Sequence, residues 1–156
     1  MKSLRVLTWT ELFWPHIGGV ETFSRHLMAA LQKRGCELAV ITSASDKAGA
    51  GEDDLNGIQI HRFHFQRVIK DRDLNAIQRM KTRVANLIQQ IDPDLVHIHS
   101  SQPSIFFLSL VLRNLSFPTL FTCHGLHPEL QGPNSLVERQ LRAADCVPAV
   151  SHSALS

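Results

Sequence analysis

The fold is decided by residues 4–42, LRVLTWTELFWPHIGGVETFSRHLMAALQKRGCELAVIT. This stretch opens with an alternating, β-rich segment at 4–10. After a loop with two glycines, it continues into helically spaced apolar residues over about 20–34. Gly35 stands where a helix C-terminus favours glycine, and residues 37–42 form a continuous apolar run typical of a strand buried on both faces. The pattern therefore predicts a strand, a helix and a second strand.

The same alternation continues along the chain. Residues 43–56 are small and polar and predict a long loop. Further strands are expected at 57–63, 95–99, 119–123 and 146–150, and helices at about 73–90, at 104–115 and from Pro133 to about Ala144. The order predicts an α/β fold: a three-layer Rossmann-like domain with a mostly parallel central sheet and helices on both faces.

Composition excludes several classes of protein. The chain has 156 residues, of which 44% are hydrophobic and 19% charged, an ordinary composition for one globular domain. Its 16 basic and 14 acidic residues give a net charge of +2, so we expect no nucleic-acid partner. No apolar run reaches the ~18 residues of a membrane span, and no signal peptide is visible. The three cysteines form no CxxC motif, so we expect buried, reduced thiols and a cytoplasmic protein.

Ligands of such folds lie beyond the carboxyl ends of the strands, so the loops there hold the candidate residues. The first loop contains Trp14, His16 and the pair Gly18-Gly19 before a helix. Paired glycines let backbone approach a ligand, and a helix N-terminus offers free N–H groups to an anion. The alternative is a tight turn without a ligand. The loop matches neither GxGxxG nor the P-loop, which disfavours an NAD-dependent dehydrogenase.

The second loop follows His97-Ile98-His99 and begins at Ser100. Residues two apart on a strand share a face, so both imidazoles could converge on one metal ion. The alternative places His97 inside the sheet and lets only His99 reach the ligand cleft. We favour this alternative because no acidic residue follows nearby to complete a ligand set.

The third loop contains His124, Gly125 and His127 after the strand at 119–123. His124 is predicted to be a hydrogen-bond donor or proton-transfer group aimed into the cleft, and the alternative is a loop histidine without a role. A Cys123–His124 dyad is disfavoured because adjacent strand residues point to opposite faces.

Four motifs in order resemble the amino-terminal domain of family 4 (group 1) retaining glycosyltransferases, which have the GT-B fold. Each motif is weak alone, and together they extend over essentially the whole chain. They are Phe13-x-Pro15-His16-x-Gly18-Gly19-x-Glu21, Pro93-Asp94-x-Val96-His97-x-His99, Thr122-x-His124-Gly125 and Ala144-Asp145-x-Val147-x-Ala149-x-Ser151.

The resemblance implies that residues 1–156 are one half of a GT-B enzyme, a single Rossmann-like domain truncated from a longer protein. In this family the amino-terminal half binds the acceptor (a glycan, a lipid-linked or a small molecule), and the carboxyl-terminal half binds the nucleotide-sugar. No cofactor and no protein-bound metal are implied, and the isolated chain is expected to be inactive.

The resemblance also assigns roles to the loop residues. Gly18, Gly19 and His16 approach the donor diphosphate and the acceptor, and His124 contacts the donor sugar near the reacting centre as the catalytic candidate. The acceptor cleft is then expected to comprise Trp14, His99, Ser100, Gly125 and His127.

Two alternatives stay open. The chain could instead be a non-catalytic Rossmann-like module that binds a sugar, a phosphate or a protein.

Separately, the stretch from His61 to Arg83 holds seven Lys or Arg residues. It is either a solvated helix face or a surface that docks on anionic lipid at the inner face of a membrane.

Overall fold

A computed structural model of the chain describes residues 2–99, 103–124 and 135–150. A six-stranded sheet with the order β3-β4-β2-β1-β5-β6 forms its centre, and every neighbouring pair is parallel except β3 and β4. The strands are β1 (Arg5–Trp9), β2 (Glu37–Ser43), β3 (Gly51–Leu55), β4 (Ile58–Phe63), β5 (Leu95–His99) and β6 (Thr119–Thr122). The helices are α1 (Gly19–Lys33), α2 (Phe65–Asp71), α3 (Leu74–Ile91), α4 (Ile105–Leu112) and α5 (Leu136–Ala143).

Local sequence explains how the two longest helices begin and end. Asp73 caps α3 because its carboxylate accepts hydrogen bonds from the N–H groups of Asn75 and Ala76, at 2.8 and 3.2 Å. After α1, Gly35 adopts φ +84° and donates to the carbonyl of Gln32, while the next N–H bonds the carbonyl of Leu31. This is the Schellman arrangement expected of a glycine after a helix.

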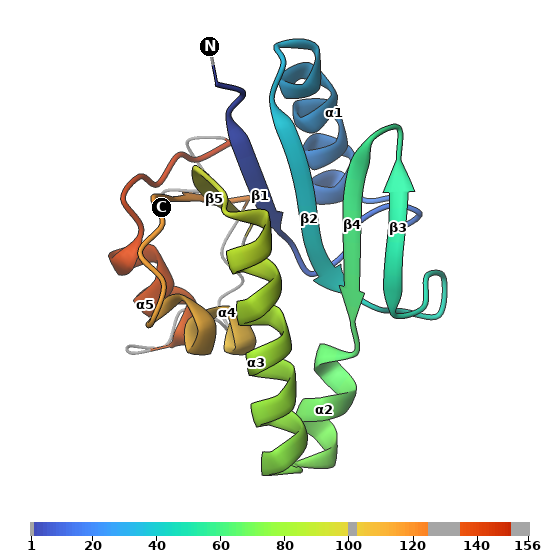
Figure 1. Cartoon of the computed structure of the whole chain (residues 1–156), viewed down its shortest axis with the longest axis vertical. Helices are drawn as coiled ribbons and strands as arrows, with labels where there is room; N and C mark the ends of the chain where they lie inside the picture. Colours follow the sequence, from blue (N-terminus) through green and yellow to red (C-terminus); the bar gives the residue numbers. More distant parts are fainter. Residues whose placement is uncertain (1, 100–102, 125–134, 151–156) are drawn as a thin grey trace.

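Helices cover both faces of the sheet, as predicted (Figure 1). On one face, the helices α2 to α5 pack on the sheet over a large apolar core. Its centre is an aromatic stack in which Phe65 lies 5.6, 5.3 and 5.0 Å from the rings of Trp9, Phe63 and Phe107. On the other face, α1 contributes Met28 to a smaller core against β1, β2 and β4.

One prediction was wrong: the expected loop 43–56 contains β3, which pairs antiparallel with β4. The strand reads Gly-Glu-Asp-Asp-Leu and is almost fully exposed, so no apolar alternation marks it. The missed signal is Asn56-Gly57, whose φ values of 53° and 85° form the two-residue hairpin turn that this dipeptide favours.

The end of the chain also differs from expectation. The expected strand 146–150 is reduced to two isolated parallel bridges, Leu120 with Cys146 and Cys123 with Ala149. Pro148 lies between them and has no N–H group with which to continue a ladder. Because this segment runs along the outer edge of the sheet, Cys146 is exposed rather than buried, whereas Cys123 is buried and Cys36 is partly buried.

The helices differ less from expectation. Residues 65–71, where no helix or strand was predicted, form α2. The last helix begins at Leu136, where the Ser135 hydroxyl caps it by accepting from the N–H of Glu138 at 3.1 Å. The expected start at Pro133 lies outside the described residues.

Candidate functional site

Three histidines lie together on the α1 face of β5 and just beyond β6. His97 and His99 point to the same side of β5, with ring centroids 4.3 Å apart. His99 Nδ1 is 2.7 Å from His124 Nε2, and His97 Nε2 is 2.7 Å from the hydroxyl of Thr122. The ring of Phe23 in α1 packs edge to face with the rings of His99 and His124, with ring centroids 6.1 and 5.1 Å apart.

Burial controls the charge of these rings. His97 and His99 are 4% and 1% exposed, and His124 is half-buried. Burial, and then repulsion from His124, lowers the pKa of His97 from 6.5 to about 4. Burial, followed by repulsion from His97 and His124, lowers the pKa of His99 to about 2. Burial also lowers the pKa of His124, but the nearby carboxylate of Glu21 opposes this. All three rings are therefore expected to be neutral near pH 7.

The cluster agrees in part with the alternative that placed His97 inside the sheet and let only His99 reach the ligand cleft. His97 lies inside the domain, as expected. His99 is buried as well, so its ring reaches His124 instead of the surface of a cleft. Cys123 packs in the opposite core, which confirms that it forms no dyad with His124. Among the described residues, no group of three or more His, Cys, Asp or Glu side chains is placed to hold a metal ion.

The Gly18-Gly19 turn begins α1, so Phe23 joins this turn to the histidines. A side chain on Gly18 would collide with the carboxylate of Glu21, which folds back over it, whereas open space surrounds the corresponding position of Gly19. The backbone at Gly19 is therefore open to close approach, and its role in a ligand-binding turn stays a prediction. Glu21 lies in the first turn of the helix, where a negative charge is favoured by the helix dipole.

The loop between β1 and α1 is held at two points. His16 Nε2 is 2.5 Å from the hydroxyl of Ser45, which ties this loop to the segment after β2. The buried Arg62 donates to the carbonyl of Trp14 at 2.7 Å and to the carboxylate of Asp53 at 3.0 Å. Held in this way, the loop leaves Trp14 partly exposed and Ile17 91% exposed.

Sequence reasoning missed Glu11, the second residue after β1. One carboxylate oxygen accepts a hydrogen bond from the hydroxyl of Ser43 at 2.5 Å, and the other accepts from the backbone N–H of Ser104 at 2.8 Å. Glu11 thus joins the ends of β1 and β2 to the start of α4. Its place just beyond the end of a buried strand was the available signal. Arg62 had no such signal, because it lies within β4.

Several predicted site residues cannot be placed. Ser100, Gly125 and His127 lie outside the described residues, so their expected place in the acceptor cleft stays a prediction. Of the expected set, the structure brings together His99, His124 and the helix that begins at Gly19.

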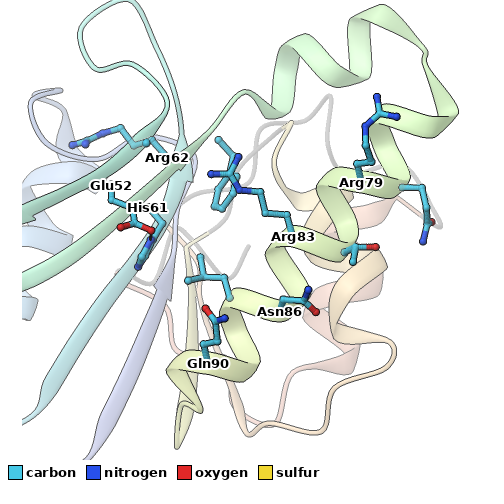
Figure 2. A pocket seen from close by; sticks show the side chains of 12 residues that line it. Glu52, His61, Arg62, Arg79, Arg83, Asn86 and Gln90 are labelled. Atoms are coloured by element: carbon cyan, nitrogen blue, oxygen red, sulfur yellow. Dashed lines mark ion pairs between the residues drawn. The ribbon is translucent and has the colours of Figure 1, made fainter.

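Residues of the basic stretch 61–83 line both sides of a different feature, a groove of about 520 Å³ between the strands β3 and β4 and the helix α3. Figure 2 shows Glu52 and His61 on the strands facing Arg83, Asn86 and Gln90 on α3. The Arg83 guanidinium lies 5.3 Å from the centre of the Phe63 ring. In the part of the chain that is described, no helix has both the length and the apolar character of a membrane span.

A mostly parallel sheet between helices, with polar loops at its carboxyl edge, is the doubly wound class of α/β domain, whose ligands bind beyond the carboxyl ends of the strands. The family model of Glycosyltransferase Family 4 matches residues 17–156. The chain therefore belongs to this family of glycosyltransferases.

Individual relatives agree with the family. The phosphatidylinositol N-acetylglucosaminyltransferase GPI3 subunit of Saccharomyces cerevisiae is 24% identical over 119 residues, which is 75% of this chain and 26% of that protein. The chain thus spans about a quarter of the length of this curated relative.

Two solved structures share the fold. Sucrose-phosphate synthase from Thermosynechococcus elongatus aligns with a TM-score of 0.68 and 16% identity, covering 92% of this chain and 41% of that one. The catalytic domain of Starch Synthase IV from Arabidopsis thaliana, bound to ADP and acarbose, aligns with a TM-score of 0.53 and 17% identity, covering 80% and 34%. The domain is thus one half of a GT-B fold.

Proposed function

We propose that this chain is the acceptor-side half of a retaining glycosyltransferase, which transfers a sugar from a nucleotide-sugar to a glycan, a lipid-linked molecule or a small molecule. The observation that carries the proposal is the contact of Phe23 with the His99–His124 pair. It places the helix that starts at Gly19 beside His124 at one edge of the sheet. When the sugar–diphosphate bond breaks, the leaving group needs a site for its negative charge and a hydrogen-bond donor. The open backbone at Gly19 offers the first, and His124 offers the second.

The chemistry assigns a task to each part. As the bond between the sugar and the diphosphate breaks, its electron pair goes to the diphosphate, and the sugar bonds to an acceptor oxygen that passes its proton to the leaving diphosphate. Backbone N–H groups at the start of α1 favour the negative charge that collects on the leaving group. His124 offers a ring N–H to the donor sugar or its leaving oxygen, and donors aimed at developing charge contribute most to such rates.

The relatives support the donor and acceptor classes without fixing them. The starch synthase structure holds ADP and acarbose, and the yeast relative is named for transfer of N-acetylglucosamine to phosphatidylinositol. For this chain we propose a nucleotide-sugar donor and a hydroxyl acceptor. Because the chain spans about a quarter of that relative, the proposed activity is one of a whole enzyme in which a second domain binds the donor.

The test is the substitution His124→Ala in the whole enzyme. We expect turnover to fall by roughly 10²-fold or more, the scale of removing one preorganised donor. The matched control is His26→Ala, which removes an exposed histidine of α1 and should leave turnover unchanged. The anomeric configuration of the product, read by NMR, tests retention.

Two outcomes would contradict the proposal. Near-normal turnover of His124→Ala would remove His124 from the reaction. Specific binding of a sugar or phosphate, without transfer by the whole protein to any acceptor in a broad panel, would favour the alternative of a non-catalytic binding module.

A further inference from the structure

The hydrogen bond between His99 and His124 uses a particular ring nitrogen of each residue. It joins His99 Nδ1 to His124 Nε2 over 2.7 Å. A neutral imidazole has one N–H donor and one acceptor nitrogen, so the bond exists only when one ring presents its proton and the other its lone pair. Whichever ring donates, Nε2 of His124 is occupied. Nδ1 is then the ring nitrogen that His124 can offer to a ligand.

His99 is held more firmly than His124. It lies within β5, it is 1% exposed, and its ring contacts the ring of His97 on the same face of the strand. The ring of His97 is fixed in turn by its hydrogen bond to Thr122. His124 lies beyond the end of β6 and is half-buried, so its backbone gives it less support.

We propose that His99 is a positioning residue. Its hydrogen bond to Nε2 of His124 holds that ring so that Nδ1 faces the substrate. This inference rests on the proposed function at one point, because that function supplies the substrate that His124 contacts. Phe23 completes the arrangement from α1, because its ring packs edge to face with both rings at interplanar angles of 73° and 74°. The ring of His124 is thus bounded by an apolar ring and held by its hydrogen bond to His99.

Burial suits His99 to this role. A neutral His99 can donate its Nδ1 proton to Nε2 of a neutral His124, which leaves the proton of His124 on Nδ1 for the substrate, whereas a charged ring would repel His124 once it gains a proton. The low pKa of His99, about 2, agrees with a ring that stays neutral through the physiological range. Side chains that orient a functional histidine through its second nitrogen are a common device, and their loss costs about 10- to 100-fold where they support a metal ligand.

The first experiment needs no substitution. In the chain labelled with ¹⁵N-histidine, an N–H···N hydrogen bond gives a scalar coupling between the two nitrogens, and the ring spectra report the tautomer of each histidine. We expect a coupling between His99 Nδ1 and His124 Nε2, and a single tautomer for His124. Sharp ring signals without that coupling, or a mixture of His124 tautomers, would overturn the proposal.

Substitutions extend the test. His99→Leu removes the partner, and its His124 spectrum should shift to a tautomer mixture. His99→Asn puts a carboxamide near the place of Nδ1 and should keep one tautomer. The matched control is Thr122→Val, which breaks only the bond to His97 and should leave the His124 signals in place. Equal His124 spectra for His99→Leu and wild type would also overturn the proposal.

The whole enzyme supplies a readout that a merely structural role would not give. We expect His99→Leu to lower kcat by about tenfold or more with little change in KM for the donor, and His99→Asn to restore most of the loss. Equal losses in the two variants, with both folded, would contradict positioning through the hydrogen bond. If His124→Ala leaves turnover normal while the N–H···N coupling is present, the proposed function fails and the geometry of the pair stands.

Discussion

The two faces of the sheet differ in what they bury. The face under α2 to α5 buries aromatic and aliphatic side chains, with Phe65 and Phe107 fully covered. The α1 face buries a smaller apolar cluster, and beyond it the polar His97, His99 and Thr122, which bond to one another or to His124. Apolar burial stabilises without regard to direction, whereas buried polar rings need partners at fixed positions. One face thus mainly stabilises the domain, and the other orients polar groups.

The largest effect is expected on the apolar face. Phe65→Ala should lower the free energy of unfolding by about 3–5 kcal/mol, because it removes a fully buried ring from the centre of the aromatic stack. Domains of this size are commonly stable by only about 5–15 kcal/mol, so the variant should be marginally folded. Urea unfolding measures the loss.

The matched substitution on the other face is Phe23→Ala. Phe23 is 39% exposed, so its loss should cost less than about 1.5 kcal/mol. Equal losses for the two phenylalanines would mean that the two faces do not differ in their contribution to stability.

Mild acid should act mainly through the α1 face. The folded chain keeps His97 and His99 neutral, with pKa values lowered to about 4 and about 2, whereas the unfolded chain binds protons near the ordinary value of 6.5. The unfolded state therefore holds more protons below pH 6.5, and stability falls as the pH falls. The slope approaches about 1.4 kcal/mol per pH unit for each such histidine.

Urea unfolding between pH 7 and 5, above the range in which carboxylates protonate, measures this slope. His97→Asn should flatten it, and the exposed-site control His26→Asn should leave it unchanged. A slope that His97→Asn does not alter would show that His97 is not held neutral by burial.

The smallest effect is expected at the groove on the α3 face. If the stretch 61–83 docks on anionic lipid, changing Arg79, Lys81 and Arg83 to Gln should weaken sedimentation with phosphatidylserine-containing vesicles by severalfold, because basic side chains near an anionic surface are attracted to it. The control changes the exposed Lys33, Arg34 and Lys47, which carry the same total charge. Equal partitioning of the two triple variants would favour a solvated helix face.

Much of the fold was readable in the sequence because its signals are local. The apolar runs of β2 and β5, the spacing along α1 and α3, and Gly35 each reflect the backbone preferences or burial of a few neighbouring residues. β3 was not predicted because an exposed edge strand has no apolar period. A full strand at 146–150 was predicted wrongly because an apolar segment can run beside a sheet without forming a regular ladder. The family match confirms the resemblance that the ordered motifs indicated.

By itself, the sequence determined the α/β class and the family, and it pointed to the loops that hold the candidate residues. It did so because periodicity and short motifs are properties of adjacent residues. Only the tertiary structure decided that His99 lies behind His124, that Phe23 joins the Gly18-Gly19 helix to both, and that Glu11 ties three segments together. These contacts join residues 25 to 101 positions apart. They depend on strand order and on side-chain direction, which no local pattern encodes.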